Sequence, residues 1–333
     1  MRRLIGRSKR AYKPPPPRHE WLTAACAVLI AALAGGCAQD GASAPTAPLL
    51  AFGRTGMGPG EFSYPRAAVL GSDELVRIVD KAARIQSYSL DGGFLRDWKT
   101  PEMQAGMPTG LGADNEGRIY VADTHYARVL IYDSQGRLLE KFGSFGTGPG
   151  QFGLPTDVAV ARDGCLYVSE YGVNDRVSKF TPQHEWLFSF GGKDAGQAAL
   201  RRPQSLLVAP DDTVWVADAC NHRICHFDAA GRFLGSIGKP GRGSGELRFP
   251  YGLDRLSDGS FVVAEFGNNR VQRFDSSGRS LGVWGTPGRG PGQLAYPWAV
   301  AALPADRVLI VDSGNNRVQV IDGLARSTWR SPE

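Results

Sequence analysis

The stretch Pro250–Gly285, PYGLDRLSDGSFVVAEFGNNRVQRFDSSGRSLGVWG, contains the signals of four short strands separated by turns. Ser260–Ala264 is a β-branched and aromatic run, and Arg270–Phe274 alternates apolar with polar residues, as half-buried strands do. The Gly and Asn residues between these two runs tolerate a left-handed backbone, and so does the Gly of the following hairpin. The stretch therefore predicts a sheet of four antiparallel strands.

The same unit recurs six times along the chain, at a period of about 47 residues. Each copy begins at a proline: Pro65, Pro108, Pro155, Pro203, Pro250 and Pro297. A period in the 40s is typical of stacked supersecondary units, and four-stranded sheets repeated around an axis form a β-propeller. We therefore expect an all-β, six-bladed β-propeller over residues 49–322.

The ends of the repeated region predict how the ring closes. The sixth unit has three strand patterns, the last of them through Val318–Asp322, and no fourth one follows. Leu49–Gly53, LLAFG, resembles Leu138–Gly143, LLEKFG, which is the fourth strand of the second unit. Residues 49–53 are therefore expected to complete the last blade, which leaves no long exposed strand edge in the ring.

Three stretches carry a family resemblance: Phe142–Val160, Val214–Phe227 and Val308–Val320. Together they contain a Gly-x-Gly-Pro-Gly-Gln-Phe linker, a Val-Tyr-Val-Ala-Asp-type strand and an Asn-x-Arg-Val turn. With these motifs in register in six units, the chain resembles the NHL-repeat β-propellers over residues 49–322. The resemblance implies that a ligand lies over the central channel on the face, here called the top, that carries the Gly-rich linkers.

The N-terminal residues 1–37 resemble an export signal. A basic region runs to Arg18 and is followed by the apolar stretch Trp21–Leu33 and by Ala-Gly-Gly-Cys37. The apolar stretch is shorter than the roughly 20 residues of a membrane-spanning helix. The ending is similar to a bacterial lipobox, which implies lipidation at Cys37, export, and anchoring in the cell envelope, with the periplasmic side of the outer membrane favoured. The alternative is an uncleaved signal anchor.

Two short segments flank the repeated region. Residues 38–48 are small and polar enough for a flexible tether, and residues 323–333 form a C-terminal tail.

The basic character of the chain belongs to its N-terminal segment. Residues 1–37 hold seven basic side chains and one acid, so residues 38–333 retain 31 basic and 32 acidic side chains. A near-neutral body lacks the positive field that binding to nucleic acid requires, so we expect no nucleic-acid partner. The Gly-rich linker Gly146–Gly150 is not a phosphate loop, because no helix and no Lys-Ser/Thr pair follows it.

The residue after each of the six prolines is expected to point toward the channel mouth. These residues are Arg66, Thr109, Thr156, Gln204, Tyr251 and Trp298. One basic, two aromatic and three polar groups would suit a polar, partly flat ligand or a peptide loop, and the alternative is ordinary channel lining. Tyr126, Tyr171 and His222 are expected on the top rim, where they would suit a partner surface. Asp157 and Asp254 are also expected near the channel, but two carboxylates fall short of a calcium site.

The turns between the second and third strands pair an acid with an arginine. The clearest pairs are Asp123 with Arg128, Asp218 with Arg223, Glu265 with Arg270, and Asp312 with Arg317. Opposite charges at the two ends of one turn can pair or bind the turn backbone, which predicts a scaffold role.

Two cysteines flank one of these turns. Cys220 and Cys225 could form a disulfide in an oxidising compartment, and the alternative is two buried thiols.

The enzymatic alternative is the peptide-amidating lyase family, which resembles NHL propellers and uses three zinc-binding histidines. A catalytic zinc needs about three protein ligands. Of the histidines after the leader, only His125 and His222 are expected on the top face, so we expect no metal and no cofactor. The sequence thus favours a monomeric, non-catalytic binding or scaffold module for an envelope protein or a small polar ligand; the alternative is a metal-dependent lyase resembling the peptide-amidating lyases.

Overall fold

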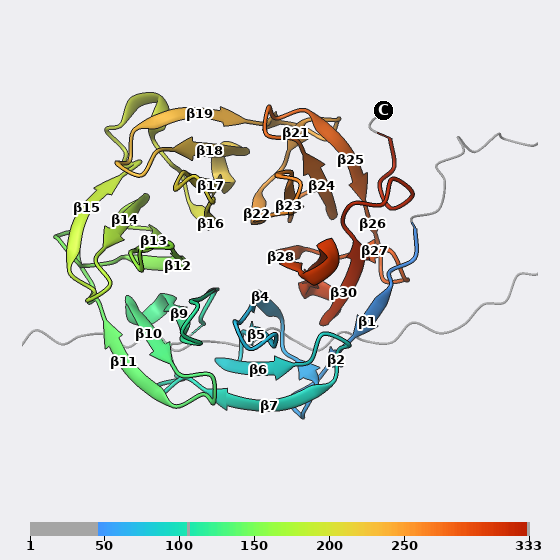
Figure 1. The fold of residues 1–333 in the computed structure, drawn as a ribbon, viewed down its shortest axis with the longest axis horizontal. Helices are drawn as coiled ribbons and strands as arrows, with labels where there is room; N and C mark the ends of the chain where they lie inside the picture. The colour runs from blue at the N-terminus through green and yellow to red at the C-terminus, as the bar shows by residue number, and fades with distance from the viewer. Residues whose placement is uncertain (1–45, 105–106, 332–333) are drawn as a thin grey trace, which may run out of the picture. The chain divides into compact units, whose positions relative to one another are not determined.

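The computed structural model describes residues 46–104 and 107–331, which form a ring of six blades around a central channel (Figure 1). Cys37 and all but the last residues of the expected tether lie outside the described residues. Each blade is a four-stranded antiparallel sheet with its first strand at the channel and its last strand on the outside. No helix within the described residues has the length and apolar character needed to cross a membrane. The expected all-β, six-bladed propeller is confirmed.

The strands follow the repeat in order. Blade 1 holds β4 (Pro65–Leu70), β5 (Val76–Asp80), β6 (Arg84–Tyr88) and β7 (Phe94–Lys99), and blade 2 holds β8 (Gly110–Ala113), β9 (Ile119–Asp123), β10 (Arg128–Tyr132) and β11 (Leu138–Phe142). Blade 3 holds β12 (Leu154–Val160), β13 (Leu166–Tyr171), β14 (Arg176–Phe180) and β15 (Trp186–Phe190), and blade 4 holds β16 (Pro203–Val208), β17 (Val214–Asp218), β18 (Arg223–Phe227) and β19 (Phe233–Ile237). Blade 5 holds β22 (Pro250–Arg255), β23 (Phe261–Glu265), β24 (Arg270–Phe274) and β25 (Ser280–Trp284).

Blade 6 combines the two ends of the repeated region. It holds β28 (Pro297–Leu303), β29 (Arg307–Asp312), β30 (Arg317–Asp322) and, as its outer strand, β1 (Leu50–Phe52). β1 is antiparallel to β30, with Leu50 opposite Val320 and Phe52 opposite Val318. The outer strand of the last blade thus comes from the N-terminal side of the ring, as the sequence comparison predicts.

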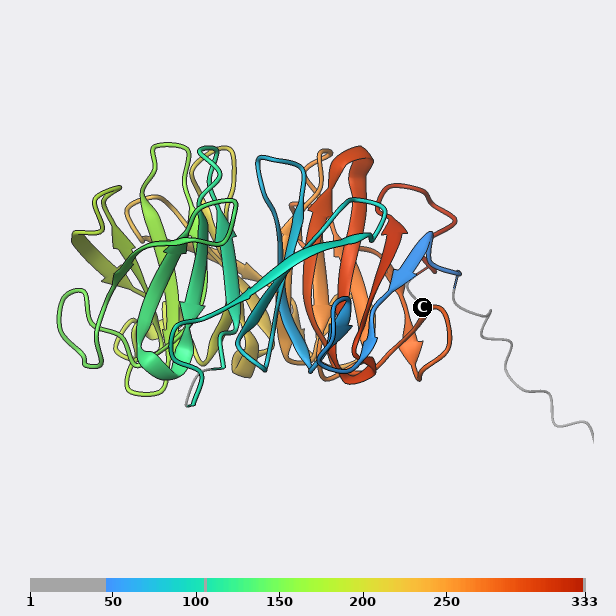
Figure 2. The same cartoon turned by 90° about the horizontal axis from the view of Figure 1, so that it is seen from below.

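Short irregular elements connect the strands. Three of the Gly-rich linkers contain small parallel pairs: β2 (Arg54–Thr55) with β3 (Glu61–Phe62), β20 (Lys239–Pro240) with β21 (Glu246–Leu247), and β26 (Thr286–Pro287) with β27 (Gln293–Leu294). One-turn 3-10 helices occupy other turns: η1 (Thr124–Tyr126), η2 (Gly196–Ala198), η3 (Ala219–Asn221), η4 (Pro304–Asp306) and η5 (Ser313–Asn315). The side view shows these connections above and below the blades (Figure 2).

The apolar core is divided into six clusters, one at each interface between neighbouring blades. Because successive side chains of a strand point to opposite faces of the sheet, the inner strands of a blade present one apolar face to each of the two neighbouring blades. The cluster between blades 6 and 1 includes the fully buried Phe62 and Tyr88, and Leu50 and Phe52 of β1 pack against it. Each blade is therefore stabilised by its two neighbours, and the ring depends on closure.

The segments expected to be a loose tether and a tail are tied to blade 5 where the structure describes them. The Trp284 indole nitrogen donates to the Thr46 carbonyl at 3.0 Å, and the Thr46 hydroxyl donates to the Ser327 carbonyl at 2.9 Å. Trp329 is buried in the cluster that contains Trp284, and Arg330 exchanges backbone hydrogen bonds with Val283. Indole packing and backbone pairing thus hold the described ends of the chain against blade 5.

Candidate functional site

The turn ion pairs are part of the frame that holds the top face. In blade 6 the Arg317 Nε donates to Asp312 at 2.7 Å, and its Nη2 donates to the carbonyls of Gly290 and Gln293 at 2.7 and 2.8 Å. The pair therefore fastens the turn to the Gly-rich linker. The corresponding distances are 2.8 Å for Asp123–Arg128, 2.8 Å for Asp218–Arg223 and 2.5 Å for Glu265–Arg270. Burial raises the pKa of Asp312, an effect that Arg317 opposes.

His222 links two blades. It adopts a left-handed backbone, as do Asn269 and Asn316 at the same place in later repeats. The side chains of these three residues accept the backbone N–H of Phe249, Tyr296 and Tyr64 at 3.0, 2.7 and 2.6 Å, respectively. Burial lowers the pKa of His222, which agrees with a neutral imidazole acting as acceptor. Its ring is therefore engaged in the scaffold and is not a free rim group.

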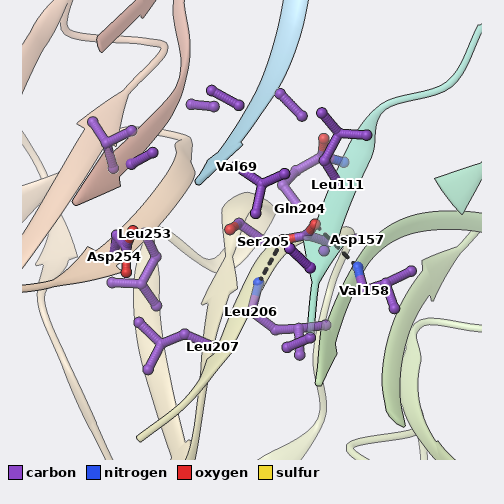
Figure 3. A pocket seen from close by; sticks show the side chains of 18 of the residues that line it. Val69, Leu111, Asp157, Val158, Gln204, Ser205, Leu206, Leu207, Leu253 and Asp254 are labelled. Carbon is purple, nitrogen blue, oxygen red and sulfur yellow. Dashed lines mark hydrogen bonds between the residues drawn. The ribbon is translucent and has the colours of Figure 1, made fainter. Parts of the chain in front are cut away.

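A cavity of about 330 Å³ occupies the channel between the first strands of all six blades (Figure 3). At its top end it is lined by five of the six residues that follow a proline: Arg66, Thr109, Gln204, Tyr251 and Trp298. Thr156 does not line the cavity. We call the top end of this cavity, with Arg66, Gln204, Tyr251 and Trp298, the mouth.

The two threonines connect inner strands. The Thr109 hydroxyl donates to the Thr156 carbonyl at 3.0 Å, and the Thr156 hydroxyl donates to the Pro203 carbonyl at 2.8 Å. Thr156 is fully buried and also bonds Ser169 at 2.8 Å. Its expected place at the mouth is wrong, because the hydroxyl turns sideways into the next blade.

One wall of the mouth is aromatic. The Tyr251 ring stacks on Phe266 with centroids 4.6 Å apart and meets Trp298 edge-on at 4.9 Å. Arg66 lies over Trp298, with 4.8 Å from its Cζ to the ring centroid. Tyr251 is only 7% exposed, so it forms the wall and does not project from it.

A second arginine that the sequence analysis missed belongs beside the mouth. Arg202 precedes Pro203 in a left-handed conformation, and its Cζ lies 4.8 Å from the ring centroid of Tyr171. Its charge acts on both Arg66 and Tyr251. The sequence feature that could have identified Arg202 is its position directly before a repeat proline. Tyr64, Phe249 and Tyr296 hold the same position in other repeats and also have a left-handed backbone.

The predicted rim tyrosines are both held against arginines. Tyr171 lies under Arg202, and Tyr126 lies under the buried Arg128, with 4.6 Å between the Arg128 Cζ and the ring centroid. Both tyrosines are half-buried.

The two carboxylates deeper in the channel also join blades. Asp157 accepts the N–H of Val158 and of Leu206, each at 3.0 Å, and Asp254 accepts those of Arg255 and Ala302, each at 2.7 Å (Figure 3 shows the Asp157 bonds). Burial raises the pKa of Asp157 to about 7, and it raises the pKa of Asp254 as well. Each of these two carboxylates therefore bridges its own inner strand and the inner strand of a neighbouring blade.

Within the described part of the chain, the histidines are not grouped with other metal-ligand side chains. His184 stacks on Phe142 at 4.8 Å and bonds Glu140, and His226 stacks on Trp215 at 3.9 Å. His125 is exposed near Arg66, whose charge together with burial lowers the His125 pKa. Over residues 46–104 and 107–331, no three His, Cys, Asp or Glu side chains are grouped as metal ligands. The residues therefore do not fit the three-histidine zinc site of the amidating-lyase alternative.

The cysteine pair is not bonded. Cys220 and Cys225 are free thiols, which agrees with the alternative to a disulfide, although Cys220 is only partly buried. Cys225 is completely buried in the cluster between blades 3 and 4, and its Sγ lies 3.6 Å from Asp218. Cys220 instead lies in η3, across the turn, which explains why the two side chains do not meet.

Comparisons with known proteins agree with this architecture. The family model for the NHL repeat matches residues 200–227 and 294–321. NHL repeat-containing protein 3 of Mus musculus is 31% identical over 154 residues, covering 43% of this chain and 44% of that protein. Peptidylglycine alpha-amidating monooxygenase of Rattus norvegicus is 32% identical over 126 residues, covering 34% of this chain and 13% of that protein. The matched stretches thus span less than half the length of these curated relatives.

Solved structures share the fold at low identity. The streptogramin B lyase structure superposes with a TM-score of 0.57 at 16% identity, covering 82% of this chain and 87% of that one. Such a likeness shows the fold alone. The chain is thus a six-bladed β-propeller that contains NHL repeats at residues 200–227 and 294–321.

Proposed function

We propose that this propeller is a non-catalytic binding module that takes a small polar ligand at the mouth on its top face. The observation that carries the proposal is the mouth itself: a cavity of about 330 Å³ with a guanidinium, that of Arg66, over an aromatic wall. Concave sites with apolar walls and a few placed polar groups are typical of ligand binding.

The engagement of the reactive side chains supports binding without turnover. The Thr109 hydroxyl donates to a backbone carbonyl, and Asp157 and Asp254 each accept two backbone N–H groups. A nucleophile or general base needs a free lone pair directed at the substrate. Each of these groups directs at least one hydrogen bond to the backbone of a neighbouring blade, which supports a structural role for it.

The test is native mass spectrometry of the full chain after incubation with a polar metabolite extract. A bound species of unchanged mass, lost in the Tyr251→Ala/Trp298→Ala double variant, is the expected result. Phe145→Ala/Trp186→Ala is the matched control, because Phe145 and Trp186 are 70% and 37% exposed and do not line the cavity. Retention of the ligand by the first double variant, or release of a chemically altered product, would reject the proposal.

A second candidate is lyase activity, favoured by the similarity to peptidylglycine alpha-amidating monooxygenase. That candidate requires stoichiometric metal. Metal analysis of the purified full chain decides it: bound zinc lost on His125→Ala would favour the lyase, and zinc below stoichiometry would reject it.

We also propose export and envelope anchoring through Cys37, with the propeller monomeric. Its support is the signal-like N-terminal sequence, which ends in Ala-Gly-Gly-Cys. Metabolic labelling with a fatty acid, followed by membrane fractionation of wild type and Cys37→Ala, tests the anchor. Label retained by Cys37→Ala would exclude that site, and light scattering of the detergent-solubilised protein gives the oligomeric state.

A further inference from the structure

One guanidinium group in the mouth, that of Arg66, and one beside it, that of Arg202, form no ion pair with a carboxylate of the described residues. Arg66 enters β4 in blade 1, and Arg202 leads into β16 in blade 4. Among the described residues, the Arg66 side chain makes one hydrogen bond, a weak one from Nη2 to the Met107 sulfur at 3.8 Å. Burial lowers the pKa of Arg66, and the charge of Arg202 lowers it further. The two like charges thus act on one another, and neither is paired with a carboxylate of the described residues.

In and beside the mouth, three buried donor atoms have no acceptor among the described residues. They are Nε of Arg66, Nε of Arg202 and Nε2 of Gln204, and Gln204 is only 5% exposed. Other arginines in the ring also have an unpaired Nε, but Arg77 and Arg84 each bind a carboxylate through their remaining nitrogens. A buried donor without an acceptor is unfavourable, so an external acceptor would stabilise this arrangement.

The surroundings of the donors select the kind of acceptor. The planar fork of arginine matches a carboxylate, and a charge-assisted hydrogen bond is stronger than a neutral one. The aromatic wall of Tyr251 and Trp298, with Phe266 stacked on Tyr251, suits a flat apolar group next to that charge.

We propose that the mouth binds a carboxylate that adjoins an aromatic or flat apolar group, with Arg66, Arg202 and Gln204 as donors to the carboxylate. This inference rests on the proposed binding function and names its ligand class. A free aromatic acid and the C-terminal residue of a peptide both present this chemistry. The carboxylate places its oxygens between the guanidiniums of blades 1 and 4, while the ring lies against the wall from blades 5 and 6.

The experiment is calorimetric titration of the full chain with four defined ligands. These are N-acetyl-phenylalanine, its primary amide, inorganic phosphate, and a hexapeptide ending in phenylalanine. Binding of N-acetyl-phenylalanine without binding of the amide is expected, since only the charge differs. Tighter binding of the hexapeptide than of N-acetyl-phenylalanine would identify a peptide C-terminus as the source, and equal or weaker binding would identify a free acid.

Substitutions of the two arginines test which side chains donate hydrogen bonds to the ligand carboxylate. Arg66→Gln and Arg202→Gln should each weaken binding of N-acetyl-phenylalanine by at least about tenfold, as expected for loss of a charge-assisted hydrogen bond. Arg201→Gln is the matched control, because Arg201 is the exposed neighbour of Arg202. Melting temperatures of all three variants show whether the fold is intact, and Arg66→Lys separates a requirement for the fork from one for charge alone.

The outcomes distinguish the two proposals. Equal affinity for the acid and the amide, binding of phosphate alone, or unchanged affinity in both arginine variants would overturn the carboxylate inference. If a neutral metabolite binds and is lost only in Tyr251→Ala/Trp298→Ala, the binding function stands and the carboxylate class fails. If no metabolite from the extract and none of the four ligands binds, both fail.

Discussion

Phe52→Ala tests how strongly the ring depends on its N-terminal strand. Phe52 lies in β1 at the outer edge of blade 6, yet its ring lies 5.0 Å from Tyr88 of blade 1. It also covers Gly92 in the next turn of that blade. One side chain therefore joins the first and last blades.

The magnitude follows from its burial and its aromatic contact. Full burial of such a side chain contributes about 1.5 to 3 kcal/mol, and Phe52 is half-buried. The aromatic pair with Tyr88 adds about 1 kcal/mol. We expect Phe52→Ala to lower the free energy of unfolding by about 2 to 3 kcal/mol, which corresponds to a Tm decrease of roughly 4 to 8 °C in a domain of this size.

Differential scanning calorimetry of the full chain measures the effect. Phe145→Ala is the control, since Phe145 is 70% exposed and its truncation should change stability by less than about 0.5 kcal/mol. Deletion of residues 49–53 should be more severe, because it opens the β30 edge to pairing with other molecules. An equal Tm for wild type and Phe52→Ala, or a deletion variant that stays monomeric and fully stable, would refute closure by β1.

Three further predictions concern buried polar groups. The pKa of Asp157 is raised to about 7, so the folded state binds more protons than the unfolded state between about pH 4 and pH 7, and the stabilisation from this group is complete below pH 4 and lost as pH rises through 7. The Tm of Asp157→Asn relative to that of wild type should therefore increase on going from pH 4 to pH 8. A Tm difference that stays constant over this range would contradict the prediction. Thr156→Val should destabilise by about 1 to 3 kcal/mol in urea titration, because it leaves the carbonyl of the next blade unpaired, and a loss below about 0.5 kcal/mol would mean that the bond contributes little. Cys220 should react with a thiol reagent in the native protein and Cys225 only after unfolding; an intact mass two hydrogens below the dithiol form would instead reveal a disulfide.

Local spacing explains why so much of the fold could be predicted. Strand runs such as Phe261–Glu265 and turn residues such as Asn269 act over a few neighbours, and a regular repeat turns six local patterns into a ring. The resemblance between Leu49–Gly53 and a fourth strand predicts the outer strand of blade 6 for the same reason. The predicted acid–arginine pairs form because both partners belong to one turn.

The errors occur where a side chain chooses between two blades. Thr156 has the same place in the repeat as Trp298, but a small hydroxyl can bond the next strand, whereas an indole is too large and remains at the channel. Cys220 and Cys225 are close in sequence, yet one belongs to the turn and the other to the core. Both outcomes depend on packing between blades, for which no short pattern exists.

The sequence by itself determined the six blades, the closing strand and the ion-paired turns, because hydrophobic period and turn chemistry are local properties of the chain. Only the tertiary structure decided the composition of the mouth. Arg66 and Trp298, which line the cavity, come from blades 1 and 6, and Arg202 beside it leads into blade 4, so their arrangement depends on the curvature of the closed ring. Whether a buried donor finds an acceptor is likewise settled by neighbours distant in sequence, and that is why the unpaired guanidiniums became visible only in three dimensions.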